Sequence, residues 1–184
     1  MELIDIYDEL NNDLGYSVDR KKAHSDNLWH RHASTWIMND KGEILLQQRS
    51  KNKKKNPLLW GKTGGHVGHL ETPLEAVKRE TLEELGLKLN DRDIKLLDVY
   101  KSNSNEHYFS YGYISFTNNK IEDFVLQKEE VEKVKYYKIE ELEKYKENNS
   151  KDFTFYKWSN DSFKEQMDKL KKYRELYKKN NMKK

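Results

Sequence analysis

Residues 65–87 read GHVGHLETPLEAVKRETLEELGL, and this stretch decides the fold. Thr72-Pro73-Leu74-Glu75 has the pattern of a capping box, with Thr72 at the N-cap, proline at the first helical position and Glu75 at the third. Gly86 suits the position just beyond the end of a helix. The segment therefore predicts a helix that starts at Thr72 and stops at Gly86. Its apolar stripe, which should face the core, consists of Leu74, Val77, Thr81 and Leu85.

Three glutamates share an adjacent arc of that helix, because Glu80, Glu83 and Glu84 follow one another at i, i+3 and i+4. Like charges at this spacing repel by roughly 0.2–0.5 kcal/mol per pair, and the C-terminal half of a helix disfavours negative charge. A divalent cation reverses that cost, since hard ions such as Mg²⁺ take carboxylate oxygens as ligands. The alternative is a solvated acidic face, which these three residues alone would favour.

Eight residues of the stretch together resemble the catalytic box of the Nudix hydrolases, G-x5-E-x7-R-E-U-x-E-E-x-G-U, where U is a bulky aliphatic residue. They are Gly65, Glu71, Arg79, Glu80, Glu83, Glu84, Gly86 and Leu87. Thr81 departs from the pattern at the first U position, where a β-branched residue can still pack. The resemblance implies an α/β Nudix fold, in which a mixed β-sheet is sandwiched between helices and the box forms a loop–helix–loop.

The resemblance also implies a metal site. The glutamates that match Glu80, Glu83 and Glu84 hold a divalent ion in the family, here Mg²⁺ with Mn²⁺ as the alternative. The backbone carbonyl of the residue before the box, Gly64, often joins them. Four residues are implied to support the loop: Glu71 and Arg79, which pair with each other, Gly65 and Gly86.

A further glutamate from a late loop commonly completes such a site in the family. Glu130 is the candidate here and Glu129 the second choice, because both precede the expected strand at 132–137. A carboxylate would then take a proton from the attacking water as general base. Glu83 or Glu80 could do so, and Glu130 is an alternative, since relatives differ in this residue.

Four residues outside the acidic arc are candidates for substrate binding. Arg49 and Lys51 belong to a basic stretch that either contacts phosphate or is a solvated loop. Trp60 either packs against a base or anchors the loop, and anchoring is favoured. His66 is expected to face substrate. A zinc site is disfavoured, because the chain has no cysteine and His30 and His32 are expected to face opposite sides of a strand.

The function that the resemblance implies is hydrolysis of the diphosphate linkage in a nucleoside diphosphate joined to another moiety. Asp5-Ile-Tyr-Asp, His30-Arg31 and Gly65-His66-Val67 resemble a Nudix subgroup similar to isopentenyl diphosphate isomerase. That enzyme has a cysteine in the region matching residues 61–65, which here read GKTGG. Hydrolysis is therefore favoured over isomerisation. A non-catalytic nucleotide- or RNA-binding module is a further alternative, disfavoured because the catalytic glutamates are intact.

The composition fits a cytoplasmic enzyme with a small-molecule diphosphate partner. The chain has 184 residues and no cysteine, and it contains neither an apolar leader nor a stretch suited to span a bilayer. Residues 1–150 carry 24 basic and 27 acidic side chains, against 11 and 5 in residues 151–184, so the basic excess lies at the C-terminus. A nucleic-acid partner is nevertheless disfavoured, and no membrane partner is expected.

Two regions are expected along the chain. Residues 1–150 form the Nudix domain with an N-terminal strand, and residues 151–184 form a basic amphipathic C-terminal helix that packs on the domain or on the second subunit of a homodimer. The stripe that would pack consists of Phe163, Met167, Leu170, Tyr173 and Leu176. Strands are predicted at 2–7, 33–38, 43–49, 94–102, 107–116 and 132–137, helices at 139–147 and 159–179, a turn at 11–15 and a loop at 60–71.

Overall fold

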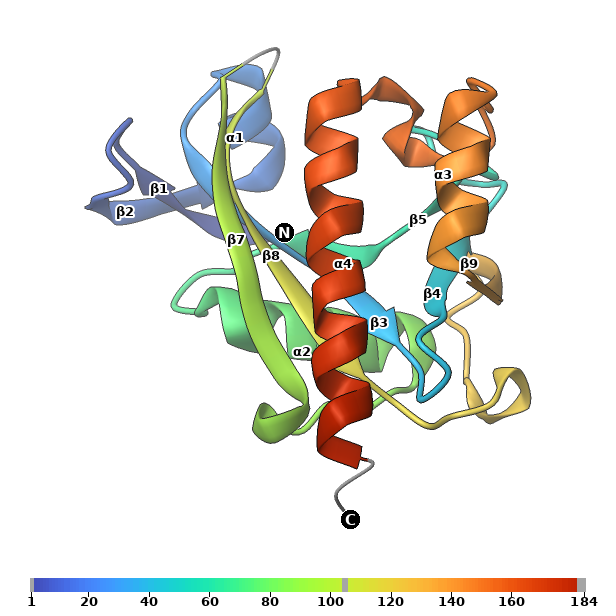
Figure 1. The fold of residues 1–184 in the computed structure, drawn as a ribbon. Coiled ribbons are helices and arrows are strands. Elements are labelled where there is room, and N and C mark those ends of the chain that lie inside the picture. The colour runs from blue at the N-terminus through green and yellow to red at the C-terminus, as the bar shows by residue number, and fades with distance from the viewer. Residues whose placement is uncertain (1, 104–105, 182–184) are drawn as a thin grey trace.

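A seven-stranded mixed sheet forms the centre of the protein in the computed structural model, which describes residues 2–103 and 106–181. Its strands run in the order β5-β4-β3-β8-β7, while β6 pairs with β3 and β9 pairs with β4 (Figure 1). Strands β3 and β8 are parallel, and the other pairs are antiparallel. The strands are β3 (His30–Met38), β4 (Ile44–Arg49), β5 (Trp60–Gly61), β6 (Thr63–His66), β7 (Ile94–Asn103), β8 (His107–Phe116) and β9 (Val131–Tyr137).

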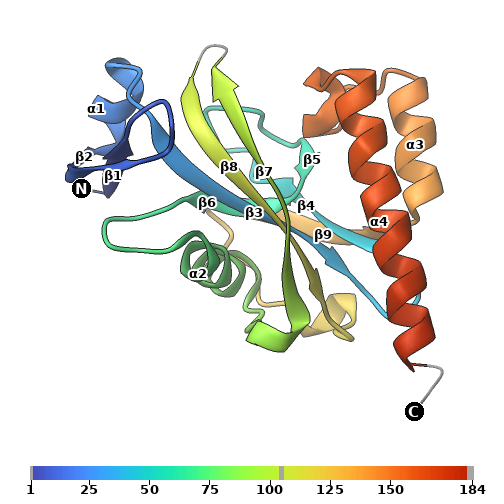
Figure 2. The same cartoon turned by 60° about the vertical axis from the view of Figure 1, so that its left-hand side comes forward.

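Helices cover both faces of this sheet, as the sequence predicted (Figure 2). Helix α2 (Pro73–Leu85) packs on one face, where Val77 and Leu85 join a buried cluster with Ile37 of β3. On the other face, α3 (Ile139–Glu147) and α4 (Asn160–Asn181) pack against a second cluster around Trp36 and Ile114. Short 3₁₀ turns lie at Asp91–Asp93, Ile121–Asp123 and Thr154–Lys157.

Helix α2 has the ends that its sequence predicted. Thr72 accepts a hydrogen bond from the Glu75 backbone, the Glu75 side chain returns one to Thr72, and Gly86 ends the helix in the left-handed conformation at φ 66°. In the predicted stripe, Val77, Thr81 and Leu85 are fully buried and Leu74 packs against the same cluster. The apolar stripe thus fixes the rotation of the helix and with it the position of the acidic arc.

Helix α4 packs most of its predicted stripe onto the sheet. Phe163, Met167 and Leu170 are buried with Trp36, and Tyr173 lies partly buried at the edge of the same cluster. Leu176 does not follow, because its side chain is 46% exposed. Among the described residues, no helix has the length and apolar character needed to cross a membrane.

Two predictions about local structure were wrong. The segment 11–15 is not only a turn, because β2 starts at Asp13 and pairs with β1 (Leu3–Tyr7) up to Asp19. The segment 60–71 is not all loop, because it contains β5 and β6, which are recruited by pairing with β4 and β3. Glycine-rich strands this short carry no period of their own, so tertiary pairing decides their conformation. Helix α1 (Arg20–Ser25) was also not predicted.

Strand β1 is tied to the loop that precedes α2. The carboxylate of Asp5 accepts hydrogen bonds from His69 Nδ1 at 2.6 Å and from the Leu70 backbone nitrogen at 2.9 Å. The His69 backbone nitrogen donates to the Leu3 carbonyl at 2.9 Å. The N-terminal hairpin therefore holds one side of the loop from which the candidate site is built.

Candidate functional site

The acidic arc of α2 places its three glutamates in different surroundings. The side chain of Glu83 is 51% exposed and that of Glu80 only 16%, while Glu84 is buried. Burial raises the pKa of Glu80, and the adjacent Arg79 opposes that rise. Burial also raises the pKa of Glu84 to about 8, with the charges of Glu80 and Glu130 adding to the rise. The like charge of Glu83 thus acts on Glu80, and that of Glu80 acts on Glu84.

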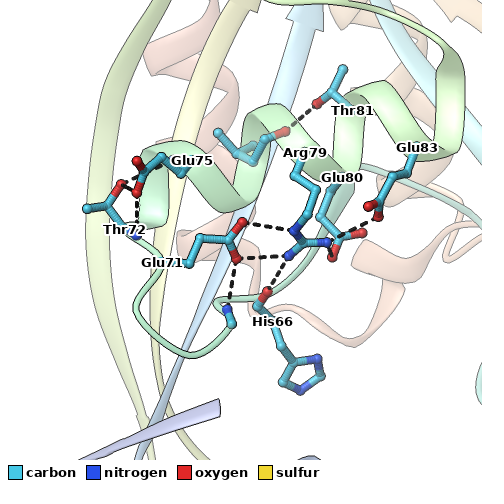
Figure 3. Close-up of polar contacts among 10 residues, drawn as sticks. His66, Glu71, Thr72, Glu75, Arg79, Glu80, Thr81 and Glu83 are labelled. Carbon is cyan, nitrogen blue, oxygen red and sulfur yellow. Dashed lines mark hydrogen bonds and ion pairs between the residues drawn. The ribbon is translucent and has the colours of Figure 1, made fainter. Parts of the chain in front are cut away.

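Arg79 locks the loop before α2 onto the helix (Figure 3). Its guanidinium grips Glu71 with two hydrogen bonds, from Nε at 2.8 Å and from Nη2 at 3.0 Å. Nη2 also donates to the His66 carbonyl at 3.2 Å, and Nη1 donates to Glu80 at 2.9 Å and to Glu83 at 3.2 Å. Since the two-pronged pair fixes geometry as well as charge, the loop and the acidic arc form one rigid unit.

Two glycines allow strand β6 to approach its neighbours closely. A Cβ at Gly65 would lie 2.3 Å from Glu80 Oε1, and one at Gly64 would lie 2.3 Å from the Ala33 carbonyl oxygen. Gly64 also has a φ of 155°, which side-chain-bearing residues rarely adopt. Glu80 thus occupies the space that a side chain at position 65 would fill, and the backbone of β6 lies against the carboxylates.

This donor set has the oxygen chemistry that a hard divalent cation prefers, although its three carboxylates do not all lie within 4.8 Å of one another. It offers oxygen ligands from Glu80, Glu83 and Glu84, and the buried Glu84 already accepts a hydrogen bond from Gln47 Nε2 at 2.8 Å, which orients it. The carbonyl of Gly64 belongs to the adjacent strand. Burial is the main cause of the raised pKa of Glu84, the charges of Glu80 and Glu130 add to it, and a cation would favour the ionised carboxylate against both.

Of the two late-loop candidates, Glu130 and Glu129, only Glu130 is electrostatically coupled to Glu84. Glu129 is exposed, whereas Glu130 is half-buried and its charge acts on Glu84. The Glu130 carboxylate forms an ion pair with Lys53 of the basic loop, residues 50–57, and the Glu130 carbonyl accepts a hydrogen bond from the Ser50 backbone nitrogen at 2.8 Å. The basic loop therefore reaches the acidic group through Lys53, a lysine that the sequence did not single out.

The four candidates for substrate contact lie in different settings. Arg49 is partly engaged, donating from Nε to the Lys55 carbonyl at 3.1 Å, and Lys51 is exposed. Trp60 is 9% exposed and packs edge-on against Tyr137, a placement that favours anchoring. His66 is half-buried on the face of the sheet opposite α2, with its ring directed towards other imidazoles.

Those imidazoles form a group that the sequence did not reveal. Ring nitrogens of His24, His30 and His66 all lie within 4.8 Å of one another, and the Nε2 atoms of His24 and His66 are 2.9 Å apart. Glu106 Oε1 lies 3.7 Å from His24 Nδ1. Burial lowers the pKa of all three histidines, that of His66 to about 2, so they are neutral and able to act as metal ligands.

The expectation that His30 and His32 face opposite sides of β3 was wrong. Residues two apart in a strand share a face, and both rings lie near that of His66, with centroid distances of 5.4 and 5.6 Å. The pairing of β6 with β3 sets His66 opposite His32, and α1 adds His24. His24, His30 and His66 do not follow a sequence spacing that predicts contact between them. Their proximity is therefore known only from the fold.

Comparisons with known proteins agree with this architecture. A family model described as NUDIX domain matches residues 28–159. "Nudix hydrolase 3" of Arabidopsis thaliana is 32% identical over 155 residues, which are 78% of this chain but 20% of that protein. An "Isopentenyl-diphosphate Delta-isomerase" of Corynebacterium glutamicum is 33% identical over 91 residues, 49% of this chain and 48% of that protein. The chain thus spans half or less of the length of these two relatives.

Solved structures show the same fold. DR0079 from Deinococcus radiodurans superposes with a TM-score of 0.62 at 21% identity, covering 77% of this chain and 86% of that one. The NUDIX domain of Shewanella oneidensis NrtR, solved in complex with ADP ribose, gives a TM-score of 0.54 at 16% identity and covers 69% of this chain and 88% of that one. At these identities the likeness concerns the fold alone.

Proposed function

The chain belongs to the Nudix domain family, and from this premise we propose that it is a divalent-metal-dependent hydrolase. Its substrate class is a nucleoside diphosphate joined to another moiety, cleaved at the diphosphate linkage by water attack on phosphorus. The observation that carries the proposal is the acidic arc of α2, in which Arg79, paired with Glu71, holds Glu80 and Glu83, and Gln47 holds Glu84. Mg²⁺ is the proposed ion, with Mn²⁺ as the alternative.

Each part of the site has a role in this proposal. Glu80, Glu83 and Glu84, with the Gly64 carbonyl, would hold the ion, which when bound neutralises diphosphate charge and lowers the pKa of a water ligand. Arg79, paired with Glu71, keeps Glu80 and Glu83 in place, and Gln47 keeps Glu84 in place. Such preorganisation allows charge stabilisation without rearrangement.

Proton transfer and substrate orientation fall to neighbouring side chains. Glu83 is the preferred general base, because its exposed carboxylate can reach a water molecule, with Glu80 and Glu130 as the alternatives. Arg49 and Lys51 would hold the phosphates, and Lys53 joins them by exchanging its ion pair with Glu130 for substrate. The partner is a small molecule rather than nucleic acid, and the location that we propose is cytoplasmic.

The substitution Glu83→Gln tests this assignment. It should lower kcat by about 10²–10⁴-fold, because a positioned base contributes that much, and chelation by EDTA should abolish wild-type activity. Turnover is measured on a panel of nucleoside diphosphate compounds that includes ADP-ribose, with thermal unfolding as the check on folding. Glu147→Gln, on the exposed end of α3, is the matched control and should leave kcat unchanged. Wild-type turnover that survives full chelation would contradict the proposal.

A second candidate function is isomerisation of isopentenyl diphosphate. The isomerase relative favours it, whereas the absence of cysteine from the sequence opposes it. We expect phosphate or nucleotide release and no interconversion of isopentenyl and dimethylallyl diphosphate. Measuring both products with the purified chain decides the matter, and robust interconversion would replace hydrolysis as the assigned reaction.

A further inference from the structure

Each of the three glutamates on the acidic arc has one carboxylate oxygen held by an N–H donor. Arg79 Nη1 donates to Glu80 Oε1 at 2.9 Å and to Glu83 Oε2 at 3.2 Å (Figure 3). Gln47 Nε2 donates to Glu84 Oε2 at 2.8 Å. The second oxygen of each carboxylate accepts no hydrogen bond from any group within residues 2–103 and 106–181. The arc therefore offers one free oxygen from each side chain.

The donor to Glu84 is a buried glutamine whose orientation is fixed from its other side. Gln47 is 3% exposed and Glu84 is 5% exposed, so bulk water does not compete for their hydrogen bond. Thr63 Oγ1 donates to Gln47 Oε1 at 3.4 Å. Turning the amide over would set its oxygen against the Glu84 carboxylate, with two acceptors facing each other. The Thr63 hydroxyl thus helps to keep the amide N–H directed at Glu84.

The backbone that carries Gln47 is held on both edges. Strand β4 pairs Gln47 with Gly61 of β5 on one side and with Val134 of β9 on the other. Thr63 lies in β6, which pairs with β3. Side chains built on paired strands keep their positions more precisely than side chains on loops. Gln47 therefore holds one oxygen of Glu84 before any ion binds.

The number of oxygens that a carboxylate offers distinguishes between divalent ions. Ca²⁺ takes about six to eight oxygen ligands and accepts both oxygens of one carboxylate, whereas Mg²⁺ requires near-octahedral geometry and combines one or two carboxylates with water. We propose that Gln47 is a specificity-determining residue that selects Mg²⁺ over Ca²⁺, because it withholds one oxygen of Glu84 from the ion. This inference rests on the proposed function and assigns the choice of metal to a residue outside the catalytic box.

Metal binding by the metal-free protein tests this inference. The full chain is treated with EDTA, dialysed, and titrated calorimetrically with Mg²⁺ and separately with Ca²⁺. Gln47→Met has a similar length but cannot donate, so the preference for Mg²⁺ over Ca²⁺, taken as the ratio of the two Kd values, should fall by about tenfold, as is usual when a partner of a metal ligand is lost. Gln48→Met is the matched control and should keep the wild-type ratio, because Gln48 donates instead to the Leu58 carbonyl at 2.8 Å.

A second pair of variants acts on the same hydrogen bond from further away. Thr63→Val removes the hydroxyl that orients the amide and keeps the shape of the side chain, so it should shift the ratio in the same direction by a smaller factor. Thr63→Ser should keep the wild-type ratio. In the background of Glu84→Gln, the substitution Gln47→Met should have no further effect on the ratio, because no carboxylate oxygen is then released.

Thermal unfolding checks that each variant is folded, and the Thr63 pair decides the matter where Gln47→Met does not fold. A wild-type ratio in both Gln47→Met and Thr63→Val would overturn the inference and leave the proposed function standing. A wild-type chain that binds no Mg²⁺ would overturn both. Because the titrations need no substrate and no turnover, a failure to hydrolyse the compounds of the substrate panel leaves their outcome readable.

Discussion

The carboxylate of Glu84 combines burial with like-charged neighbours, and this has a consequence for stability. Its pKa is raised to about 8 by burial, opposed by a hydrogen bond from Gln47 and strengthened by Glu80 and Glu130. An unfolded glutamate titrates near 4.5. Between these values the folded state holds a proton that the unfolded state has released, so stability falls as pH rises through this window.

We predict that the metal-free protein loses thermal stability between about pH 6.8 and 7.8 and that Glu84→Gln reduces this loss, because glutamine cannot ionise. The window lies above the ordinary pKa of histidine and therefore avoids the imidazole group. The measurement is Tm against pH in EDTA, repeated with excess Mg²⁺, which should remove the loss in the wild type by stabilising the ionised form. Glu83→Gln is the control, since that side chain is half exposed. Identical pH slopes for wild type and Glu84→Gln would contradict the prediction.

Several residues of the candidate site could be found from spacing alone, and others could not. Glu71 and Arg79 match a pattern whose physical content is a two-pronged ion pair, and the structure places them in that contact. His24 and Lys53 carry no such pattern. Each depends on a partner far along the chain, His66 and Glu130 respectively. A lone histidine or a lysine in a charged loop has no local sign of such a partner.

At the scale of the element, α2 depends on its first turn, because the loop that carries Glu71 enters the helix there. Thr72 accepts from the Glu75 backbone at 3.3 Å, and Glu75 accepts from the Thr72 backbone at 2.8 Å. The two hydrogen bonds of the capping box both join Thr72 and Glu75. Loss of the threonine hydroxyl oxygen would therefore leave the Glu75 backbone N–H without its acceptor.

Thr72→Ala should therefore lower the free energy of unfolding by about 1 kcal/mol, the usual effect of losing an N-cap oxygen. Thr72→Ser keeps that oxygen and should come within a few tenths of the wild type. Urea unfolding at one pH measures both variants. A Thr72→Ala chain as stable as Thr72→Ser would mean that the cap contributes nothing here.

The predicted elements were found where periodicity and end signals agreed, as in α2 and α3, whose bounds follow the sequence closely. They were missed where pairing alone decides. Strands β5 and β6 contain only two and four residues, and β6 reads TGGH. From the sequence alone, two adjacent glycines favour a loop. Here they lie in a strand because β6 pairs with β3, and their lack of side chains lets β6 lie close to Glu80.

At the scale of the whole molecule, the predicted boundary between residues 1–150 and 151–184 does not separate two cores. Residues from both regions share one hydrophobic cluster. One cluster joins sheet residues such as Trp36 with five large buried side chains beyond that point: Phe153, Phe155, Phe163, Met167 and Leu170. Burial of each is worth about 1.5–3 kcal/mol, and a domain of this kind is stable by only about 5–15 kcal/mol in all.

We therefore predict that truncation after Ser150 abolishes cooperative thermal unfolding and exposes apolar surface to a dye such as ANS. Truncation after Tyr177 removes only the end of α4 and should keep the wild-type transition, because the buried part of the stripe stays in place. Differential scanning calorimetry compares the three chains. Unchanged stability after the longer truncation, with loss of RNA binding, would instead make residues 151–184 a nucleic-acid tail.

The parallel pairing of β3 with β8 also governs when this protein can fold during synthesis. Met38 pairs with Phe116, 78 residues further along the chain, and closing so long a loop precedes any gain from the pairing. Until β8 has left the ribosome, β3 has a free edge of nine residues rich in buried side chains. Such an edge attracts other strands. A chaperone that shields nascent chains would therefore act on this protein over the interval between the synthesis of those two strands.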